Sequence, residues 1–289
     1  MKYLLSTVLA TTALTLSAVS LAASQGPEFP DDSTMAKIQE KGTLVVGVKY
    51  DIPLFGQKNP LTDSLEGYEI EIGKRLGRDL FGTDGHVKFI EAPGPVREQF
   101  VNQRKADLVI STYTITDARL ESVAFAGPIY ESKQAVVVRK DSDLFGDAIN
   151  GYEELDGHSV CVVTNSIANG LIKEKAPGAK IMALSANPDC AKAVRQGRVD
   201  IFATDDALLF GFVNETPDEL RFVDNTGGED EPYGIGVHKE SLDLCDWVNK
   251  RLLALSEEGF LEEIFNDSIG TVTDRGLDPL SSDSMKYCK

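Results

Sequence analysis

The sequence predicts an α/β protein made of two similar lobes, each built on a sheet rich in parallel strands. Short apolar runs alternate with amphipathic segments, which is the pattern of βαβ units. Two distant segments, QRKADLVISTYT (103–114) and RQGRVDIFATDD (195–206), also share one order: a basic helix end, an aspartate, an apolar strand and a polar cluster. The 289 residues, 42% of them hydrophobic, suffice for the core of one or two domains.

The expected elements follow from hydrophobic periodicity. In the first half they are strand 43–48, helix 67–80, strand 87–90, helix 96–104 and strand 107–111. In the second half they are strand 159–163, helix 167–175, strand 181–184, helix 188–196, strand 200–204 and helix 207–213. Asn187 is a candidate cap for the helix that follows it. A later strand, 233–239, leads to a helix around Trp247 that can return to the first lobe.

The N-terminus predicts export. Lys2 precedes an apolar stretch from Leu4 to Val19, and the small residues SLAAS (20–24) follow. This is the pattern of a secretory signal peptide, residues 1–23, cleaved after Ala22 or Ala23. The stretch is short for a membrane anchor, and no later segment is long and apolar enough to span a bilayer. Residues 24–33 are read as a polar linker.

The four cysteines, Cys161, Cys190, Cys245 and Cys288, favour disulfides in an exported chain. Three pairings are possible. Cys161 with Cys190 is favoured, because one lies on a strand and the other just past a strand that could neighbour it. Cys245 with Cys288 would then tie the tail, 271–289, to a helix. The alternative is free buried thiols, whereas a zinc site is not expected, since no two cysteines are close in sequence.

The formal charge of −17 argues against nucleic acid and anionic membranes as partners. The histidines, His86, His158 and His238, are scattered without metal-ligand spacing. The sequence therefore predicts no metal, no cofactor and no catalytic residue.

Polar side chains follow the two similar apolar strands. In open parallel sheets, ligands bind beyond the carboxyl ends of strands. Two facing lobes would thus place the two clusters on opposite walls of one cleft. The hydroxyls near 111–116 and Arg119 would contact an anion, and Asp205 would contact a cation. An amino acid is the simplest ligand that carries both charges.

Four motifs, in this order, carry a family resemblance: GTLVVGVKYDIPLFG (42–56), LEGYEIEIGKRL (65–76), ADLVISTYTITDARLESVAFAGPIY (106–130) and GRVDIFATDDALLFG (197–211). From about Thr34 to Ile269 the chain resembles the periplasmic solute-binding proteins of polar amino acid ABC transporters.

This resemblance implies a type II periplasmic binding protein-like fold. Two parallel-rich sheets would be joined by two crossing strands, near 134–140 and 229–239. The first lobe would comprise 34–136 and 236–270, and the second 137–235. A monomeric periplasmic protein would deliver its amino acid to a membrane permease.

The resemblance also implies ligand roles. Arg119 would hold the α-carboxylate, with Thr114 beside it and Thr112 offering backbone groups. Asp205 would receive the α-ammonium. Ser166, in the turn TNSIAN (164–169), would meet the carboxylate at a helix N-terminus.

Each of these roles has a plainer alternative. Arg119 could pair with Asp117 or Glu121 at the start of a helix. Asp205 could cap the helix that begins at Asp206.

For specificity, Arg97 matches the arginine that binds the side-chain carboxylate in glutamate- and aspartate-type members. The segment EAPGPVREQF (91–100) departs from their usual residues before it. Lys49 also resembles that subset. The alternatives are a solvated helix arginine, a solvent-facing strand end at Lys49, and a glutamine or broad polar amino acid ligand.

The expected mechanism is lobe closure around the ligand. Two other classes of function stay open on sequence alone. One is an exported dehydratase-like enzyme of the same fold, and the other is a sensor module that reports to a membrane partner.

Overall fold

A computed structural model of the chain describes residues 26–289. The predicted signal peptide and the first residues of the predicted linker lie outside the described residues. From the start to the first crossing strand, the elements are α1 (Thr34–Lys41), β1 (Leu44–Val48), β2 (Asp51–Ile52), β3 (Gly56–Lys58), β4 (Leu65–Glu66), α2 (Tyr68–Phe81), β5 (Val87–Glu91), α3 (Arg97–Asn102), β6 (Leu108–Thr114), α4 (Asp117–Leu120) and β7 (Ala124–Arg139).

The remaining elements include the second crossing strand, β13. They are β8 (Ala148–Ile149), η1 (Tyr152–Leu155), β9 (Ser159–Val163), α5 (Ile167–Lys175), β10 (Lys180–Leu184), α6 (Asn187–Arg195), β11 (Ile201–Asp205), α7 (Asp206–Glu215), β12 (Leu220–Asn225), β13 (Asp230–Val237), α8 (Leu242–Glu257), α9 (Phe260–Asn266), η2 (Ile269–Thr271) and η3 (Ser282–Ser284).

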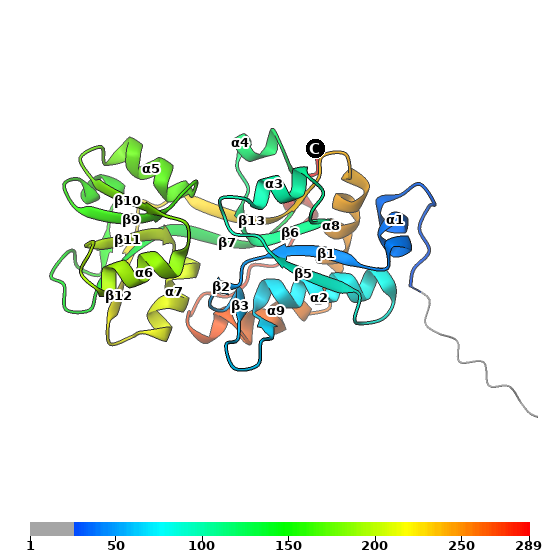
Figure 1. The fold of residues 1–289 in the computed structure, drawn as a ribbon, viewed down its shortest axis with the longest axis horizontal. Coiled ribbons are helices and arrows are strands. Elements are labelled where there is room, and N and C mark those ends of the chain that lie inside the picture. Colours follow the sequence, from blue (N-terminus) through cyan, green and yellow to red (C-terminus); the bar gives the residue numbers. More distant parts are fainter. Residues whose placement is uncertain (1–25) are drawn as a thin grey trace, which may run out of the picture.

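The strands of the main sheet follow the order β10-β9-β11-β7-β13-β6-β1-β5, and this sheet extends across two lobes. We call β5, β1 and β6 with α2, α3, α8 and α9 the first lobe, and β9 to β12 with α5 to α7 the second lobe. Figure 1 shows the lobes side by side, with β7 and β13 running between them. The parallel pairs β1–β5, β1–β6, β9–β10 and β9–β11 confirm the predicted α/β class.

The crossing strand β7 changes partners along its length. It pairs with β13 as far as Lys133 and with β11 from Gln134 onwards. It has 16 residues and begins ten residues earlier than the predicted crossing at 134–140. The Gly127–Pro128 pair within β7 is a sequence pattern that usually ends a strand. Here the strand continues, because residues on both sides of the pair are paired with β13. The predicted lobe boundaries stay a prediction.

Local chemistry explains the helices that position the site. Helix α2 buries Ile72, Leu76 and Leu80, as its spacing predicted. Helix α1, which was not predicted, is capped by Ser33 and ends at Gly42, whose φ of 75° favours glycine. The prediction that Asn187 caps α6 is wrong: Ala186 takes the cap position, Asn187 is the first helical residue, and Pro188 occupies the next.

Aromatic side chains fill the core where the crossing strands meet the first lobe. The Phe55 ring centroid lies 5.6 Å from that of Tyr130 and 6.0 Å from that of Tyr233, with edge-to-face geometry. Tyr130 also stacks on Phe265 of α9. These contacts join β7, β13 and α9 into one packed unit. It lies beside the hinge, by which we mean the stretches of β7 around Lys133 and of β13 around Glu231 that run between the lobes.

Two disulfides fix parts of the chain that are distant in sequence. Cys161 on β9 joins Cys190 on α6, and Cys245 on α8 joins Cys288 of the tail. These are the pairings that the sequence analysis favoured. Among the described residues, no helix is both long and apolar enough to cross a membrane.

Candidate functional site

A polar pocket lies between the two lobes. The first lobe lines it with Lys49, Gly94, Arg97, Thr112, Thr114 and Arg119, and the second with Val163, Thr164, Asn165, Ser166, Ile167, Asn187, Thr204, Asp205 and Leu208. All seven ligand-binding residues predicted from the sequence are in this lining. Their position in one pocket is a finding, whereas their contact with a ligand stays a prediction.

Strand β6 delivers the first group of side chains. The predicted strand ended at 111, but β6 continues to Thr114 because Thr114 and Tyr113 pair with Tyr233 and Gly234 of β13. Thr112 has a φ of 41°, a left-handed conformation that is strained for a β-branched residue. Its amide donates to Glu69 Oε1 at 2.6 Å, and its buried hydroxyl has no partner in the part of the chain described.

Arg119 is held without a carboxylate partner. Its Nη1 donates to the carbonyl of Thr114 at 2.7 Å, and its guanidinium lies 5.1 Å from the centroid of the Tyr113 ring. Arg119 lies on the short helix α4, and the Thr116 hydroxyl caps this helix by accepting from the Arg119 amide. Arg119 forms no ion pair among residues 26–289, so the alternative pairing with Asp117 or Glu121 is wrong. The other guanidinium N–H groups can bind an anion.

Arg97 and Lys49 are buried cations, with exposed fractions of 6% and 7%. Arg97 donates to the carbonyls of Ser111 and Thr112 at 2.6 and 2.8 Å and lies 4.2 Å from the Tyr113 centroid. The readings as a solvated arginine and a solvent-facing strand end are therefore wrong. Neither a hydrogen bond nor an ion pair reaches the Lys49 ammonium from the described chain.

Burial and a neighbouring positive charge shift the pKa values of these two groups. Desolvation, with the charge of Arg97 next, lowers the pKa of Lys49 to about 8. Desolvation, with the charge of Arg119 next, lowers the pKa of Arg97 to about 10. Each positive charge is therefore disfavoured first by burial and then by a neighbouring cation, and an anion placed between them would offset part of this cost.

The second lobe contributes the starts of α5 and α6. Asn165 has a φ of 61°, so asparagine does support the left-handed turn. The Ser166 hydroxyl accepts from the Asn169 amide at 3.2 Å, which caps α5 and leaves the hydroxyl hydrogen for a ligand. Asn187, which the sequence analysis treated as a cap, places a buried amide with an unpartnered Oδ1 in the lining.

Asp205 stands at the N-cap position of α7 but makes no side-chain capping bond. Its Oδ1 accepts from Gln134 Nε2 at 2.7 Å, and its Oδ2 accepts from the Tyr233 hydroxyl. Both donors belong to the crossing strands, which orients this carboxylate towards the hinge. The alternative in which Asp205 caps its helix is therefore wrong for the side chain.

A second acid, Glu231 of β13, lies near Asp205 and is 2% exposed. Burial, followed by the charge of Asp205, raises its pKa to about 8, while Thr114, Arg119 and Gln134 oppose the shift. No sequence motif points to this residue. The one available signal is the acidic pair Asp230 and Glu231 directly before the Pro-Tyr of a strand whose later residues carry no charge.

This burial predicts a pH dependence of stability. Between the ordinary pKa of about 4.5 and the raised one, the folded protein holds a proton on Glu231 that the unfolded chain releases. The contribution of this proton to the free energy of unfolding is complete below that pH window. It is lost as pH rises through the window, by up to about 1.4 kcal/mol per pH unit. The variant Glu231→Gln should therefore gain stability relative to the wild type as pH rises from 5 to 8, measured by urea unfolding.

The exposed Glu262→Gln is the matched control for this experiment, because it removes an acid that lies outside the site. Its difference from the wild type should be the same at both pH values. An equally constant difference for Glu231→Gln would contradict a proton held on Glu231.

Within residues 26–289, no group of three or more His, Cys, Asp or Glu residues could hold a metal ion. The arrangement can instead bind a small charged molecule. It offers cationic donors on the first lobe, a helix N-terminus on the second and an oriented carboxylate at the hinge.

Comparisons with known proteins show which proteins the chain resembles. Residues 44–271 match the family described as bacterial extracellular solute-binding proteins, family 3. A glutamate-binding protein of Corynebacterium efficiens is 31% identical over 270 residues, 90% of each chain. A glutamine-binding protein of Geobacillus stearothermophilus is 34% identical over 214 residues, 74% of this chain and 79% of its own. The solute receptor for L-cysteine of Neisseria gonorrhoeae superposes with a TM-score of 0.75 at 27% identity, covering 87% of this chain and 98% of its own.

Proposed function

The chain belongs to family 3 of the bacterial extracellular solute-binding proteins, and we propose that its solute is an acidic amino acid, glutamate or aspartate. Membership makes it a binding protein of an importer, not an enzyme. The proposal extends the sequence-based expectation of a periplasmic protein that captures the amino acid and delivers it to an ABC transporter permease.

The single observation that carries the ligand class is the unpartnered Lys49 ammonium beside Arg97 in the pocket lining. Ammonium and guanidinium groups donate hydrogen bonds and accept none. A ligand carboxylate between them would accept from both and offset their repulsion. An amide at the same place would leave its own N–H donors facing two cations.

The remaining groups suit the amino acid end of such a ligand. Arg119, with Thr114 and Ser166, would bind the α-carboxylate in a charge-assisted contact at the N-terminus of α5. Asp205 would accept from the α-ammonium. The three cationic side chains, Lys49, Arg97 and Arg119, would then match two ligand carboxylates. The Asp205 carboxylate would match one ligand ammonium.

Ligand binding would stabilise the closed arrangement. Arg119 and Thr114 belong to the first lobe, whereas Ser166 and Asp205 belong to the second. A ligand that contacts both walls binds the closed form more tightly and shifts the equilibrium towards it. The closed protein would then present its two lobes together to the permease.

The Lys49→Gln variant tests the ligand class. It should lower glutamate affinity by about 10- to 100-fold, since a hydrogen bond to a charged group contributes about 1.5–3 kcal/mol. Glutamine affinity should stay the same or rise, because the variant adds an amide acceptor and removes a charge. Isothermal titration calorimetry at pH 7 with glutamate, aspartate and glutamine measures both effects.

The control for this test is Lys88→Gln, which removes the same charge from an exposed position on β5. It separates a local contact from a general electrostatic effect. Wild-type protein that prefers glutamine to glutamate would refute the acidic ligand and leave the family assignment intact.

Glutamine is the second candidate, and Asn187 is the observation that favours it. Its buried Oδ1 has no donor within the described chain and could accept from a ligand amide. The same side chain can turn its NH₂ group towards a carboxylate, however, so it accommodates both ligands. Lys49 and Arg97 have no such choice, which is why we favour the acid.

A further inference from the structure

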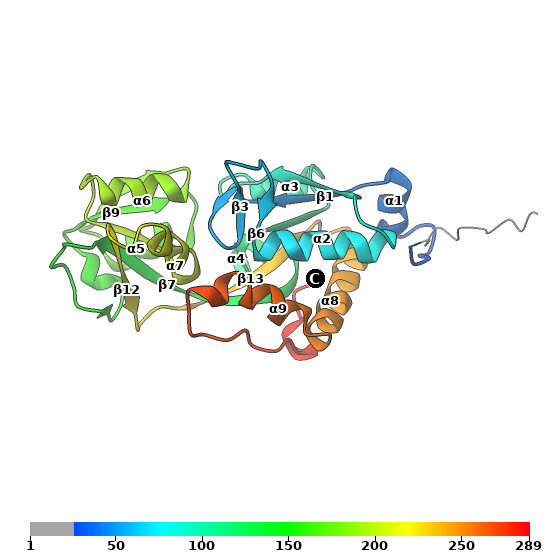
Figure 2. The ribbon, with the colours of Figure 1, turned by 90° about the horizontal axis from the view of Figure 1, so that it is seen from below.

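Residues 272–289, all but the first residue of the C-terminal tail 271–289, lie outside the family-matched residues 44–271, and they contact both lobes. After α9 and η2, Figure 2 shows the chain turning near β7 and running back towards α8. Apart from the short η3, the tail contains no helix or strand. Apolar packing of Leu277, Leu280 and Met285 against the core holds its middle, and specific polar contacts hold its two ends.

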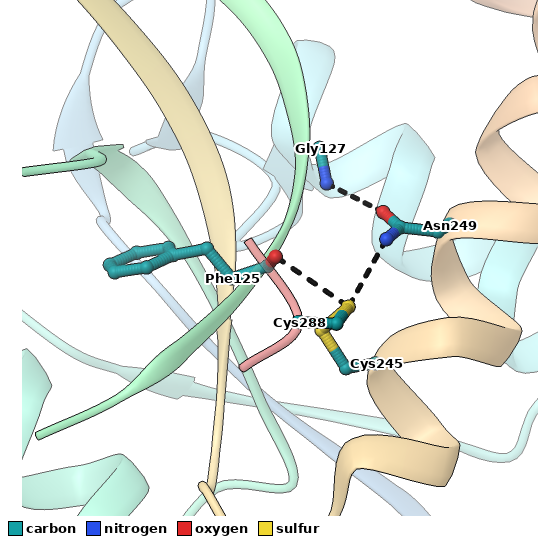
Figure 3. Close-up of a disulfide and its surroundings, with 5 residues drawn as sticks. All are labelled: Phe125, Gly127, Cys245, Asn249 and Cys288. Atoms are coloured by element: carbon teal, nitrogen blue, oxygen red, sulfur yellow. Dashed lines mark hydrogen bonds between the residues drawn. A yellow bond between two sulfur atoms is a disulfide. The ribbon is translucent and has the colours of Figure 1, made fainter. Parts of the chain in front are cut away.

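The far end of the tail is fixed to the first lobe. Cys288 is bonded to Cys245 of α8, and the Tyr287 carbonyl accepts from the Phe125 amide at 3.0 Å. Next to the disulfide, Asn249 Oδ1 accepts from the Gly127 amide at 2.8 Å (Figure 3). The tail thus ends against α8 and the start of the crossing strand β7.

The near end of the tail reaches the second lobe through Arg275. Its guanidinium donates to Oδ2 of Asp206, the first residue of α7, and lies 5.6 Å from the Phe210 ring centroid. The Asp206 side chain is fully buried, whereas that of Arg275 is 42% exposed.

The other carboxylate oxygen of Asp206 binds the hinge. Oδ1 accepts from the Ser132 hydroxyl at 2.6 Å and the Lys133 amide at 3.1 Å, both on β7. Tail, crossing strand and α7 therefore meet at one buried carboxylate. A buried carboxylate that loses its cation is strongly destabilised where it stands, so this junction depends on Arg275.

The junction is directly connected to the ligand pocket. Asp206 follows Asp205, the residue proposed to receive the ligand ammonium, with no intervening residue. We infer that Arg275 is a positioning residue: the disulfide-anchored tail holds Asp206, and through it keeps the Asp205 carboxylate where it meets the ammonium. This inference rests on the proposed binding of an amino acid and names a part of the chain that controls it.

The test is the variant Arg275→Gln in the full chain, with glutamate and 2-oxoglutarate as probes in calorimetry. 2-Oxoglutarate keeps both carboxylates but has a keto oxygen in place of the ammonium. We expect a loss of roughly tenfold or more for glutamate, a smaller loss for 2-oxoglutarate, and partial recovery of glutamate affinity in Arg275→Lys. A purely structural role would weaken both probes equally.

Arg195→Gln is the matched control. It breaks another arginine–carboxylate pair of the second lobe, to Glu219, away from the pocket. The double variant Arg275→Gln, Asp206→Asn should lose less affinity than the sum of the single losses, because both act on one pair.

Glutamate affinity within twofold of the wild type, or equal losses for both probes, would overturn the inference. A wild-type protein that binds no amino acid gives a different pattern. That result would refute the proposed function, and the role of Arg275, which rests on that function, would fail as a consequence.

Discussion

Replacing Arg119 with alanine is expected to weaken glutamate binding by at least about 30-fold. Removing one partner of a desolvated, hydrogen-bonded charge pair costs about 2–5 kcal/mol. Arg119 is suited to this role because one N–H is fixed by the Thr114 carbonyl while no carboxylate of the described chain occupies the others. Calorimetric titration of the variant with glutamate gives the loss directly.

Two further variants make this result specific. Arg119→Lys keeps the charge but not the planar fork, so it should recover part of the affinity. Arg78→Ala removes an exposed arginine from the same lobe and should bind glutamate like the wild type. If Arg119→Ala bound glutamate as well as the wild type, the α-carboxylate would have to lie elsewhere.

Replacing Asp205 with asparagine should have a comparable effect through the other end of the ligand. The shape of the side chain is kept, and Gln134 and Tyr233 still flank it. The negative charge that would face the ammonium is lost, which should cost about 2 kcal/mol or more, at least roughly 30-fold in glutamate affinity. The affinity for 2-oxoglutarate should fall much less or rise.

The ratio of the two affinities is the decisive quantity in this experiment. The wild type should prefer glutamate strongly, and Asp205→Asn should lose most of that preference. Asp218→Asn, an exposed acid of the second lobe, should leave the ratio unchanged. If the ratio of glutamate to 2-oxoglutarate affinity were unchanged in Asp205→Asn, the ligand ammonium would not bind this carboxylate.

The sequence predicted the framework because its signals are local. Apolar runs such as 159–163 and the spacing of Ile72, Leu76 and Leu80 are visible within a few residues. The short strands β2, β3 and β4 have two or three residues each and carry no such signal. Strand β6 outlasted its apolar run because a partner from β13, distant in sequence, continues the pairing to Thr114.

The sequence motifs predicted which residues line the pocket, but not the contacts between distant segments that hold these residues in place. Arg119 and Thr114 lie within one short segment. Gln134 and Asp205, in contrast, are 71 residues apart and meet because β7 pairs with β11.

The tail contact follows the same rule. Arg275 and Asp206 are 69 residues apart and meet because the tail turns back beside the hinge. The burial of Lys49 and Arg97 was also invisible in the sequence, since a lysine after a strand and an arginine at a helix start are usually solvated.

The most direct test of the account is a thermal unfolding screen of the protein, unfolded and refolded to remove carried-over ligand, against all twenty amino acids. A ligand that binds the folded state alone adds about 2.7 kcal/mol of stability at a hundredfold excess over its dissociation constant. We predict that glutamate or aspartate raises the midpoint most and glutamine much less. A larger shift with glutamine or a basic amino acid would contradict the acidic ligand, and no shift with any of the twenty would contradict amino acid binding itself.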